Sequence, residues 1–190
     1  MNKINLNNLI NINQGVEKLL AGEVIAVPTE SVYGLSVDAR NPKAVEQLLN
    51  LKGRGAQKGL IIITDELERL ENLNWIKKLD LNFKKILQKS WPGPVTYLLP
   101  LGDACPDYLK GQHESLAVRL SNHPVLLALA QNLKHPLVST SANFQGEPPA
   151  KSAQQVWDYF GPEFLVLEGD LGNLKAPTSI FDLLSGVQIR

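Results

Sequence analysis

Short apolar runs alternate along this chain with amphipathic stretches of helical spacing, and this alternation limits the possible folds more than any other feature. The runs 24–27 and 60–63 are apolar, partly β-branched and bounded by glycine, proline or polar residues, which is typical of buried strands. Several neighbouring strand runs have no helix between them, so we expect parallel and antiparallel pairs in one sheet. The pattern predicts an α/β fold with a twisted mixed sheet flanked by helices.

The bounds of the expected elements follow from the same periodicities. Asn41 and Pro42 form an N-cap and first-turn pair for a helix that ends at Gly53. Another amphipathic helix is expected to begin at Asn13 or Gln14 and to end at Gly22. The other predicted helices cover about 65–72, 75–89, 124–133 and 152–160. The other predicted strands cover 95–99, 116–120, 137–140, 164–167, 178–183 and 187–190, and the segments 28–34, 100–112 and 143–150 are predicted to be loops.

Composition excludes several classes of protein. Lys plus Arg and Asp plus Glu each number 19, so the net charge is zero, and coating of nucleic acid or of an anionic membrane by bulk charge is disfavoured. Any anion site must therefore be local. Cys105 is the single cysteine, which predicts a reducing, cytoplasmic setting. The longest apolar run, 125–130, is far short of a membrane span, and neither a signal peptide nor an interdomain linker is visible, so one domain covering 1–190 is expected.

Hydroxyl and cationic side chains concentrate in four segments that flank predicted strands. These segments are 28–34, 52–58, 139–143 and 177–179. In open α/β sheets such loops gather at one edge and form the ligand crevice, so we expect the four segments to converge.

One of these segments holds Lys52, Arg54 and Lys58 among three glycines, where the backbone can approach a ligand closely. The arrangement suits a polyphosphate, and the alternative is a solvated basic turn. Lys58 stands where the second glycine of a Walker A loop would be, and it also replaces the last glycine of the dinucleotide fingerprint. Both standard nucleotide motifs are therefore absent.

Arg119 lies inside the apolar strand predicted at 116–120, where a charged group needs a partner. A ligand carboxylate or phosphate would serve, and the alternatives are a buried ion pair or an exposed strand face. The three histidines lack zinc-binding spacing, so no dedicated metal site is expected. No G-x-S-x-G elbow is present, and positioning and electrostatics are the expected mode of catalysis.

Six motifs in order, PTESVYGL, KGR with the following KGLI, SWPGPVTYLL, SLAVRLSNHP, LVSTSANFQGEPP and APTSIFD, resemble the YrdC (TsaC) family of threonylcarbamoyl-AMP synthases from about residue 24 to residue 190. The chain is similar to the short, single-domain bacterial form. The resemblance implies a twisted sheet with a cationic concave face. It also implies that L-threonine, bicarbonate and ATP, the last carrying Mg²⁺, are converted to threonylcarbamoyl-AMP and diphosphate. The product would supply N6-threonylcarbamoyladenosine synthesis, with tRNA and downstream threonylcarbamoyl transfer proteins as possible partners.

The resemblance also implies roles for individual residues. The catalytic cations would be Lys52, Arg54 and Lys58. ATP would be bound by Arg54, Lys58, Ser115, Ser141, Asn143 and Arg190. Threonine would be bound by Ser31, Tyr33, Arg119, Ser139 and Ser179. The chain departs from the family at Ser31, where many members have Thr, and at Ile63, where some longer members have a His that reaches threonine.

Two other functions remain as alternatives. One is an RNA-binding module that uses the cationic concavity without catalysis, which the zero net charge and the absence of RNP, KH and double-stranded-RNA signatures disfavour. The other is a carbamoyl-adenylate domain of metallocluster maturation. Proteins of that kind are much longer and carry zinc-finger sequence.

Overall fold

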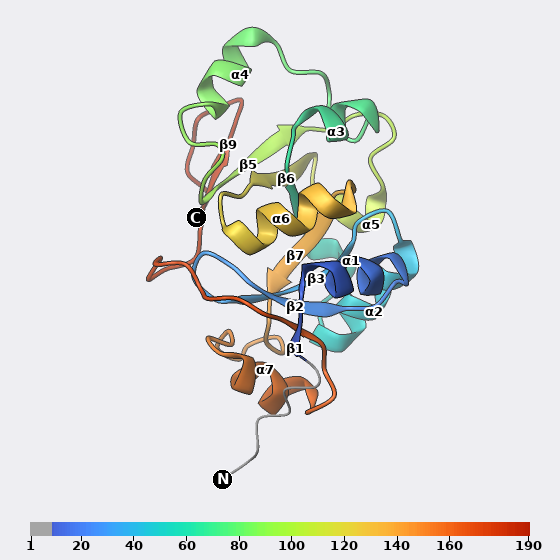
Figure 1. Ribbon diagram of the computed structural model, residues 1–190. Coiled ribbons are helices and arrows are strands. Elements are labelled where there is room, and N and C mark those ends of the chain that lie inside the picture. The colour runs from blue at the N-terminus through green and yellow to red at the C-terminus, as the bar shows by residue number, and fades with distance from the viewer. Residues whose placement is uncertain (1–8) are drawn as a thin grey trace.

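The computed structural model describes residues 9–190, and within them nine strands form one sheet in the order β1-β8-β2-β3-β7-β4-β6-β5-β9 (Figure 1). The strands are β1 (Leu9–Ile10), β2 (Ile25–Pro28), β3 (Tyr33–Asp38), β4 (Ile61–Thr64), β5 (Val95–Pro100), β6 (Ser115–Leu120), β7 (Leu137–Ser141), β8 (Val166–Leu167) and β9 (Ser179–Asp182). The helices are α1 (Ile12–Leu20), α2 (Pro42–Lys52), α3 (Glu68–Asn72), α4 (Leu81–Leu87), α5 (Asp107–Lys110), α6 (Pro124–Leu133) and α7 (Ala153–Phe160), with a short 3-10 helix, η2 (Ala56–Lys58).

Parallel and antiparallel pairs occur in the same sheet, which confirms the predicted fold class. Strand β4 pairs parallel with β6 and antiparallel with β7, while β3 pairs antiparallel with both β2 and β7. Paired residues share a face of the sheet, so the register divides the side chains into two sets.

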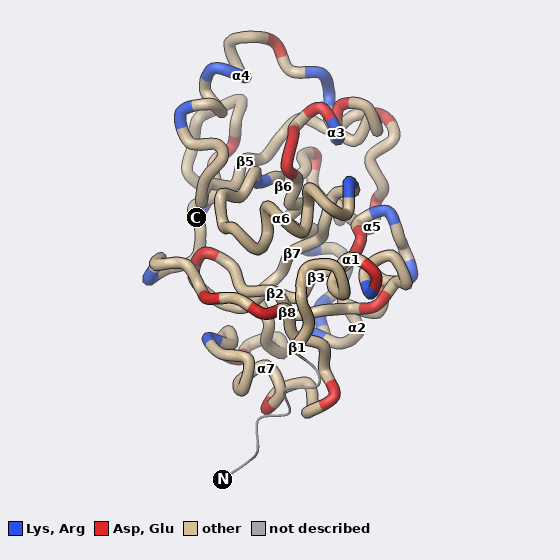
Figure 2. Tube along the Cα trace, in the orientation of Figure 1, with Lys and Arg blue, Asp and Glu red and all other residues tan. Residues whose placement is uncertain are grey.

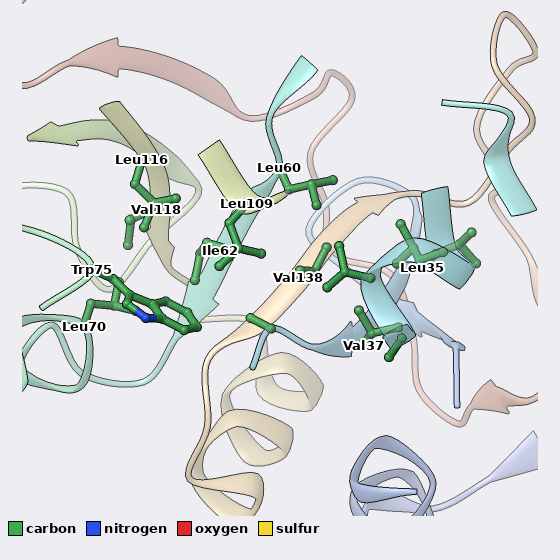
Figure 3. Packing of buried hydrophobic residues seen from close by; sticks show 14 of the residues in the cluster. Leu35, Val37, Leu60, Ile62, Leu70, Trp75, Leu109, Leu116, Val118 and Val138 are labelled. Carbon is green, nitrogen blue, oxygen red and sulfur yellow. The ribbon is translucent and has the colours of Figure 1, made fainter. Parts of the chain in front are cut away.

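One face of the sheet carries the larger part of the hydrophobic core. Ile62 is paired with both Val118 and Val138, and all three are fully buried. They pack with Leu70 and Trp75 in the cluster that Figure 3 shows from close by. Buried side chains from α2, α3, α5 and α7 belong to the same cluster, so these helices cover this face.

The opposite face carries a second, smaller core. Ile63 is paired with Leu137, and both are packed in a cluster with Leu19 of α1 and Leu126 of α6. Helices α1 and α6 lie side by side over this face (Figure 1). They cover only part of it.

Several predicted boundaries were wrong for local reasons. Helix α1 begins at residue 12 because Asn11 caps it in a capping box. The predicted helix 75–89 shortens to α4 because the Asp80 carboxylate accepts hydrogen bonds from two backbone amides of the first turn, and Ile76 instead bridges to Leu101. Helix α5 occupies part of the predicted loop 100–112.

Two further differences concern strands. Strand β3 begins inside the segment expected to be a loop, and all six of its residues are buried. At the other end of the chain, the predicted strand 187–190 makes only an isolated bridge, from Gln188 to Phe181. Strand β1 had no counterpart in the prediction.

Positive and negative side chains are interspersed along the trace, in keeping with the zero net charge (Figure 2). Among residues 9–190, no helix is long and apolar enough to cross a membrane. In the same part of the chain, no group of three or more His, Cys, Asp or Glu side chains is arranged to hold a metal ion.

Candidate active site

A pocket of about 430 Å³ opens on the face of the sheet that α1 and α6 cover only in part. Its floor includes Ile61, which is paired with both Ala117 and Ser139. None of its lining residues belongs to α1 or α6. All four predicted loop segments contribute to the lining, so their expected convergence is confirmed.

The lining residues carry positive charge and no negative charge. Among residues 9–190, five cationic side chains line the pocket, and no Asp or Glu does. The five are Arg54, Lys58, Lys110, Arg119 and Arg190. A site of this composition favours an anion with several negative groups, since each cation offsets part of the repulsion between them.

Two of the lining residues, Lys110 and His113, were missed by the sequence reasoning because they lie in or just after the predicted loop 100–112, which carries no motif. The structure brings them to the pocket because α5 packs tightly on the segment from residue 52 to residue 59, which we call the basic loop. The Leu60 amide donates to the carbonyl of Leu109 at 2.9 Å. Gly59 has a φ of 61°, and a Cβ there would lie 3.0 Å from the carbonyl oxygen of Lys110. The close approach of α5 therefore needs a glycine at this position.

Arg54 and Lys58 project into the pocket from opposite ends of the basic loop. The Nη2 atom of Arg54 donates to the carbonyl of Gly59 at 2.9 Å, which fixes the guanidinium across the loop. Burial lowers the pKa of Arg54, although an arginine stays charged at neutral pH. Lys58 is exposed, and its Nζ lies 3.2 Å from Oε1 of Gln145. Both cations are placed to meet a ligand.

Lys52 lies behind the pocket wall and is not one of its lining residues. Its buried ammonium donates to the carbonyl of Ser141 and to both the backbone and side-chain oxygens of Asn143, the last two at 2.9 and 3.0 Å. Burial, together with the charge of Arg54, lowers the pKa of Lys52 to about 8. These contacts tie the end of α2 to the segment that follows β7.

That segment is ordered by its own polar side chains as well. The Ser141 hydroxyl donates to Oδ1 of Asn143 at 2.6 Å, and Nδ2 of Asn143 donates to the carbonyl of Glu147 at 2.5 Å. Ser141 lines the pocket, whereas Asn143 is buried beside it and does not. Ser141 and Asn143 thus differ in their exposure to the pocket.

Four of the five residues expected on the threonine side line the pocket, namely Ser31, Tyr33, Arg119 and Ser139. Ser179 does not, while its neighbour Thr178 does. The Tyr33 hydroxyl donates to the carbonyl of Gly169 at 3.4 Å, and burial, with a smaller effect of Asp170, raises its pKa. The tyrosine side chain is therefore engaged by the protein itself.

Arg119 makes a buried ion pair and also lines the pocket. Its Nη2 lies 3.2 Å from Oε2 of Glu30, and both side chains are about 6% exposed. Its Nη1 donates to the hydroxyl oxygen of Thr178 at 3.0 Å. The ion-pair interpretation is confirmed, and Arg119 is at the same time a lining residue of the pocket.

Of the remaining nucleotide-side residues, Ser115 and Arg190 both line the pocket. The Arg190 backbone is tied to Ile180, because the Arg190 amide donates to the Ile180 carbonyl at 3.3 Å and the Ile180 amide donates to the Arg190 carbonyl at 3.0 Å. Its guanidinium donates to the carbonyl of Thr178 at 3.1 and 3.3 Å. Burial lowers its pKa.

Comparison with known proteins places this geometry in a family. The Sua5/YciO/YrdC family profile, described as telomere recombination, matches residues 17–190. A threonylcarbamoyl-AMP synthase of Photorhabdus laumondii is 45% identical over 168 residues, which cover 88% of this chain and 89% of that protein. One of Pseudoalteromonas atlantica is 42% identical over 171 residues, covering 90% of this chain and 91% of that protein.

A solved structure agrees with these matches. The crystal structure of P. abyssi Sua5 complexed with L-threonine has a TM-score of 0.83 to this chain at 29% identity, and the match covers 92% of this chain and 54% of the other. This chain thus spans about half the length of that archaeal protein. The profile match, the identity to curated relatives and the shared fold together establish that the chain belongs to the Sua5/YciO/YrdC family.

Proposed function

We propose that this chain is a threonylcarbamoyl-AMP synthase, a nucleotidyltransferase that converts L-threonine, bicarbonate and ATP to threonylcarbamoyl-AMP, diphosphate and water. The observation that carries the proposal is a pocket lined by five cations, several hydroxyls and no carboxylate. It occurs in a chain whose relatives at 42 and 45% identity bear that name.

In this reaction the protein must bind two anions, the carbamate and ATP, next to each other. The carbamate formed from threonine and bicarbonate attacks the α-phosphorus in line, and negative charge moves toward the leaving diphosphate. Two unit charges at 4 Å repel by about 4 kcal/mol at an effective dielectric constant of 20. Arg54 and Lys58 offset the phosphate charge, and Arg119 offsets the threonine carboxylate. No covalent protein nucleophile is required.

The proposed ATP contacts are those expected from the resemblance, divided by their position in the pocket. Arg54, Lys58, Ser115, Ser141 and Arg190 line the pocket and are proposed to touch ATP directly. Lys52 and Asn143 lie behind the wall and are proposed to act by holding the Ser141 segment in place.

On the threonine side, Ser31, Arg119 and Ser139 are proposed to contact the amino acid, together with the backbone at Tyr33. Ser179 is proposed to act through the strand that presents Thr178.

Magnesium is proposed to enter as part of the ATP substrate. Mg²⁺ prefers oxygen ligands and is commonly held by one or two carboxylates together with substrate phosphates. Because no carboxylate lines the pocket, its ligands there would be phosphate oxygens, water and hydroxyl oxygens. Its charge would add to that of the basic side chains.

The wider context is also part of the proposal. The chain is proposed to work as one catalytic domain over residues 1–190 in the cytoplasm. Its product is proposed to supply the threonylcarbamoyl modification of tRNA through downstream transfer proteins, with no membrane partner. The alternative of a non-catalytic RNA-binding module has less support, because the relatives are named as synthases.

Product identification tests the proposal. The pure protein is incubated with carbon-labelled bicarbonate, threonine and MgATP, and the nucleotide products are identified by mass. We expect an adenylate that contains threonine and one labelled carbon, together with an equal amount of diphosphate. A salt-titrated tRNA-binding assay runs beside it. Binding without any adenylate would favour the RNA module and contradict the synthase.

A further inference from the structure

A buried carboxylate stands directly behind the pocket wall, and none of the roles above uses it. Glu30 is 5% exposed and is not a lining residue, although both its neighbours in the chain, Thr29 and Ser31, are. A carboxylate is rarely this buried unless it is paired. Its surroundings therefore indicate what it does.

The Glu30 carboxylate is held from two sides. Its Oε2 lies 3.2 Å from Nη2 of Arg119, and its Oε1 accepts a hydrogen bond from the hydroxyl of Ser121 at 2.7 Å. Ser121 is 2% exposed, and its hydroxyl oxygen accepts from the His123 amide at 3.0 Å. The chain just after β6 thus fixes the position of the carboxylate that meets the β6 arginine.

The backbone at Glu30 is fixed as well. The Leu174 amide donates to the carbonyl of Glu30 at 3.0 Å, and the Gly172 amide donates to the carbonyl of Thr29 at 2.9 Å. A Cβ on Gly172 would lie 2.7 Å from the Glu30 carbonyl oxygen, so the two segments touch backbone to backbone. Neither the backbone nor the side chain of Glu30 can move without breaking several contacts.

Arg119 is left with donors that no described residue takes. Its Nη1 donates to Thr178, but its Nε is buried and has no hydrogen-bond partner within residues 9–190. A buried guanidinium with an unsatisfied N–H is costly, and that cost is removed when a ligand accepts the bond. Arg119 lines the pocket, so the pocket is the side from which a ligand can approach its guanidinium.

We propose that Glu30 is a positioning residue, which holds the Arg119 guanidinium so that its free N–H groups receive the carboxylate of the amino-acid substrate. The inference rests on the proposed function, because it takes that substrate to be threonine. Glu30 does not touch the substrate. Before the amino acid binds, the negative charge of Glu30 also compensates the charge of Arg119. The arginine therefore need not turn toward the phosphates of ATP.

The kinetic test uses Glu30→Gln, which removes the charge at constant size, and Glu30→Asp, which keeps the charge on a shorter side chain. Diphosphate release is measured with threonine varied at saturating MgATP and bicarbonate, and then with ATP varied. Glu30→Gln should raise the KM for threonine at least tenfold and leave the KM for ATP within twofold. Glu30→Asp should recover part of the threonine affinity.

A remote ion pair supplies the control. Asp65 binds Arg69 through two hydrogen bonds, of 2.7 and 2.9 Å, and neither residue lines the pocket. Asp65→Asn should lower the thermal midpoint and leave both KM values unchanged. If Glu30→Gln lowers the midpoint in the same way while the threonine KM stays at the wild-type value, the Glu30 pair is structural only and the inference is overturned.

Two further measurements keep the result decisive. Ser121→Ala, which removes the hydrogen bond to one oxygen of the Glu30 carboxylate, should raise the KM for threonine about threefold. It replaces Glu30→Gln if that variant does not fold. An unchanged KM for threonine in Ser121→Ala would count against the inference. Calorimetric titration of threonine alone gives affinity without turnover. A wild-type protein that binds threonine but forms no adenylate would contradict the proposed function and leave the Glu30 variants to decide the inference. A wild-type protein that does not bind threonine would overturn both.

Discussion

At the scale of single residues, the three cations of the basic loop differ in position, since two of them line the pocket and the third lies behind its wall. Arg54 and Lys58 line the pocket, whereas the Lys52 ammonium is buried among oxygens of Ser141 and Asn143. The spacing of the basic loop could not reveal this difference, because Lys52 is the last residue of α2 and its direction depends on where β7 ends. Composition predicts a basic loop, and only the tertiary structure divides its members.

Arg54→Ala and Lys58→Ala are each expected to lower turnover about 100-fold or more, because each removes a fixed positive charge that faces the phosphates. Diphosphate release at saturating ATP measures the effect. Lys43→Ala, an exposed lysine of α2 outside the pocket, serves as the control and should be silent. Near wild-type turnover in both pocket variants would show that the basic loop does not hold the phosphates.

Lys52 is expected to give the reaction an alkaline limit. Its pKa is lowered to about 8, so the folded protein loses this proton in a range where the unfolded chain, with a pKa near 10.5, still keeps it. Above pH 8 the charge-burial penalty is relieved, and stability from this group rises between pH 8 and 10.5. The neutral amine has fewer N–H donors for the Ser141 segment, so kcat should fall as the pH rises through about 8.

The measurement is a profile of kcat against pH at saturating bicarbonate. Lys52→Arg, whose guanidinium does not titrate in this range, should lack the fall near pH 8 even if its overall rate is lower. The same alkaline limb in Lys52→Arg would assign the titration to another group.

At the scale of elements, the parts that sequence patterns predicted well are those whose apolar residues have a clear period. Helices α2, α6 and α7 lie close to their predicted bounds, and so do strands β4, β6 and β7. Strand β3 was missed although Tyr33, Leu35 and Val37 alternate with smaller or polar residues, because its first two residues were included in the predicted loop 28–34. Gly34 is packed so closely on the Ser139 hydroxyl that a Cβ would lie 3.2 Å from it, which explains the small residue.

Helix α5 is the element whose position the sequence could not predict, and it can be tested through glycine. Gly59→Ala is expected to lower both stability and activity. Its φ of 61° with a ψ of 168° lies in a region that is nearly restricted to glycine and costs an alanine about 1–3 kcal/mol, and its Cβ would press on His113 and on the carbonyl of Lys110, which line the pocket. Gly53→Ala is the control for a positive φ alone, because its φ is 62° with a ψ of 32°, against a ψ of 168° at Gly59, and nothing lies within 4 Å of its Cβ.

Thermal unfolding and turnover are measured for both glycine variants. Both should lose stability, and only Gly59→Ala should lose activity beyond what its stability explains. Equal activity in the two variants would mean that α5 does not shape the pocket.

At the scale of the whole molecule, net charge and site charge are independent. The chain has no net charge, yet five cations and no carboxylate line the pocket. Composition leads to the expectation of a local anion site, but which residues form that site depends on the order of the strands in the sheet. Strands β3, β7, β4 and β6 are neighbours in the sheet although β7 comes after β6 in the chain, so segments around residues 31, 61, 117 and 139 meet.

The fold class and the family could be identified from the sequence because six motifs occur in order, and each sits beside a strand or a turn. The buried pair of Glu30 and Arg119 could be foreseen only as one of three alternatives, since a strand residue does not reveal its partner. Lys110 and His113 could not be foreseen at all, because neither lies in a motif.

The central claim is that a carbamate, and not threonine itself, attacks ATP in this pocket. The direct measurement is threonine-dependent diphosphate release from MgATP in buffer stripped of carbon dioxide, with and without added bicarbonate. We expect release at background level without bicarbonate and full release after its addition, because the proposed site has Arg119 hold the threonine carboxylate away from the α-phosphorus. Undiminished release without bicarbonate would identify an amino-acid adenylase and contradict the account.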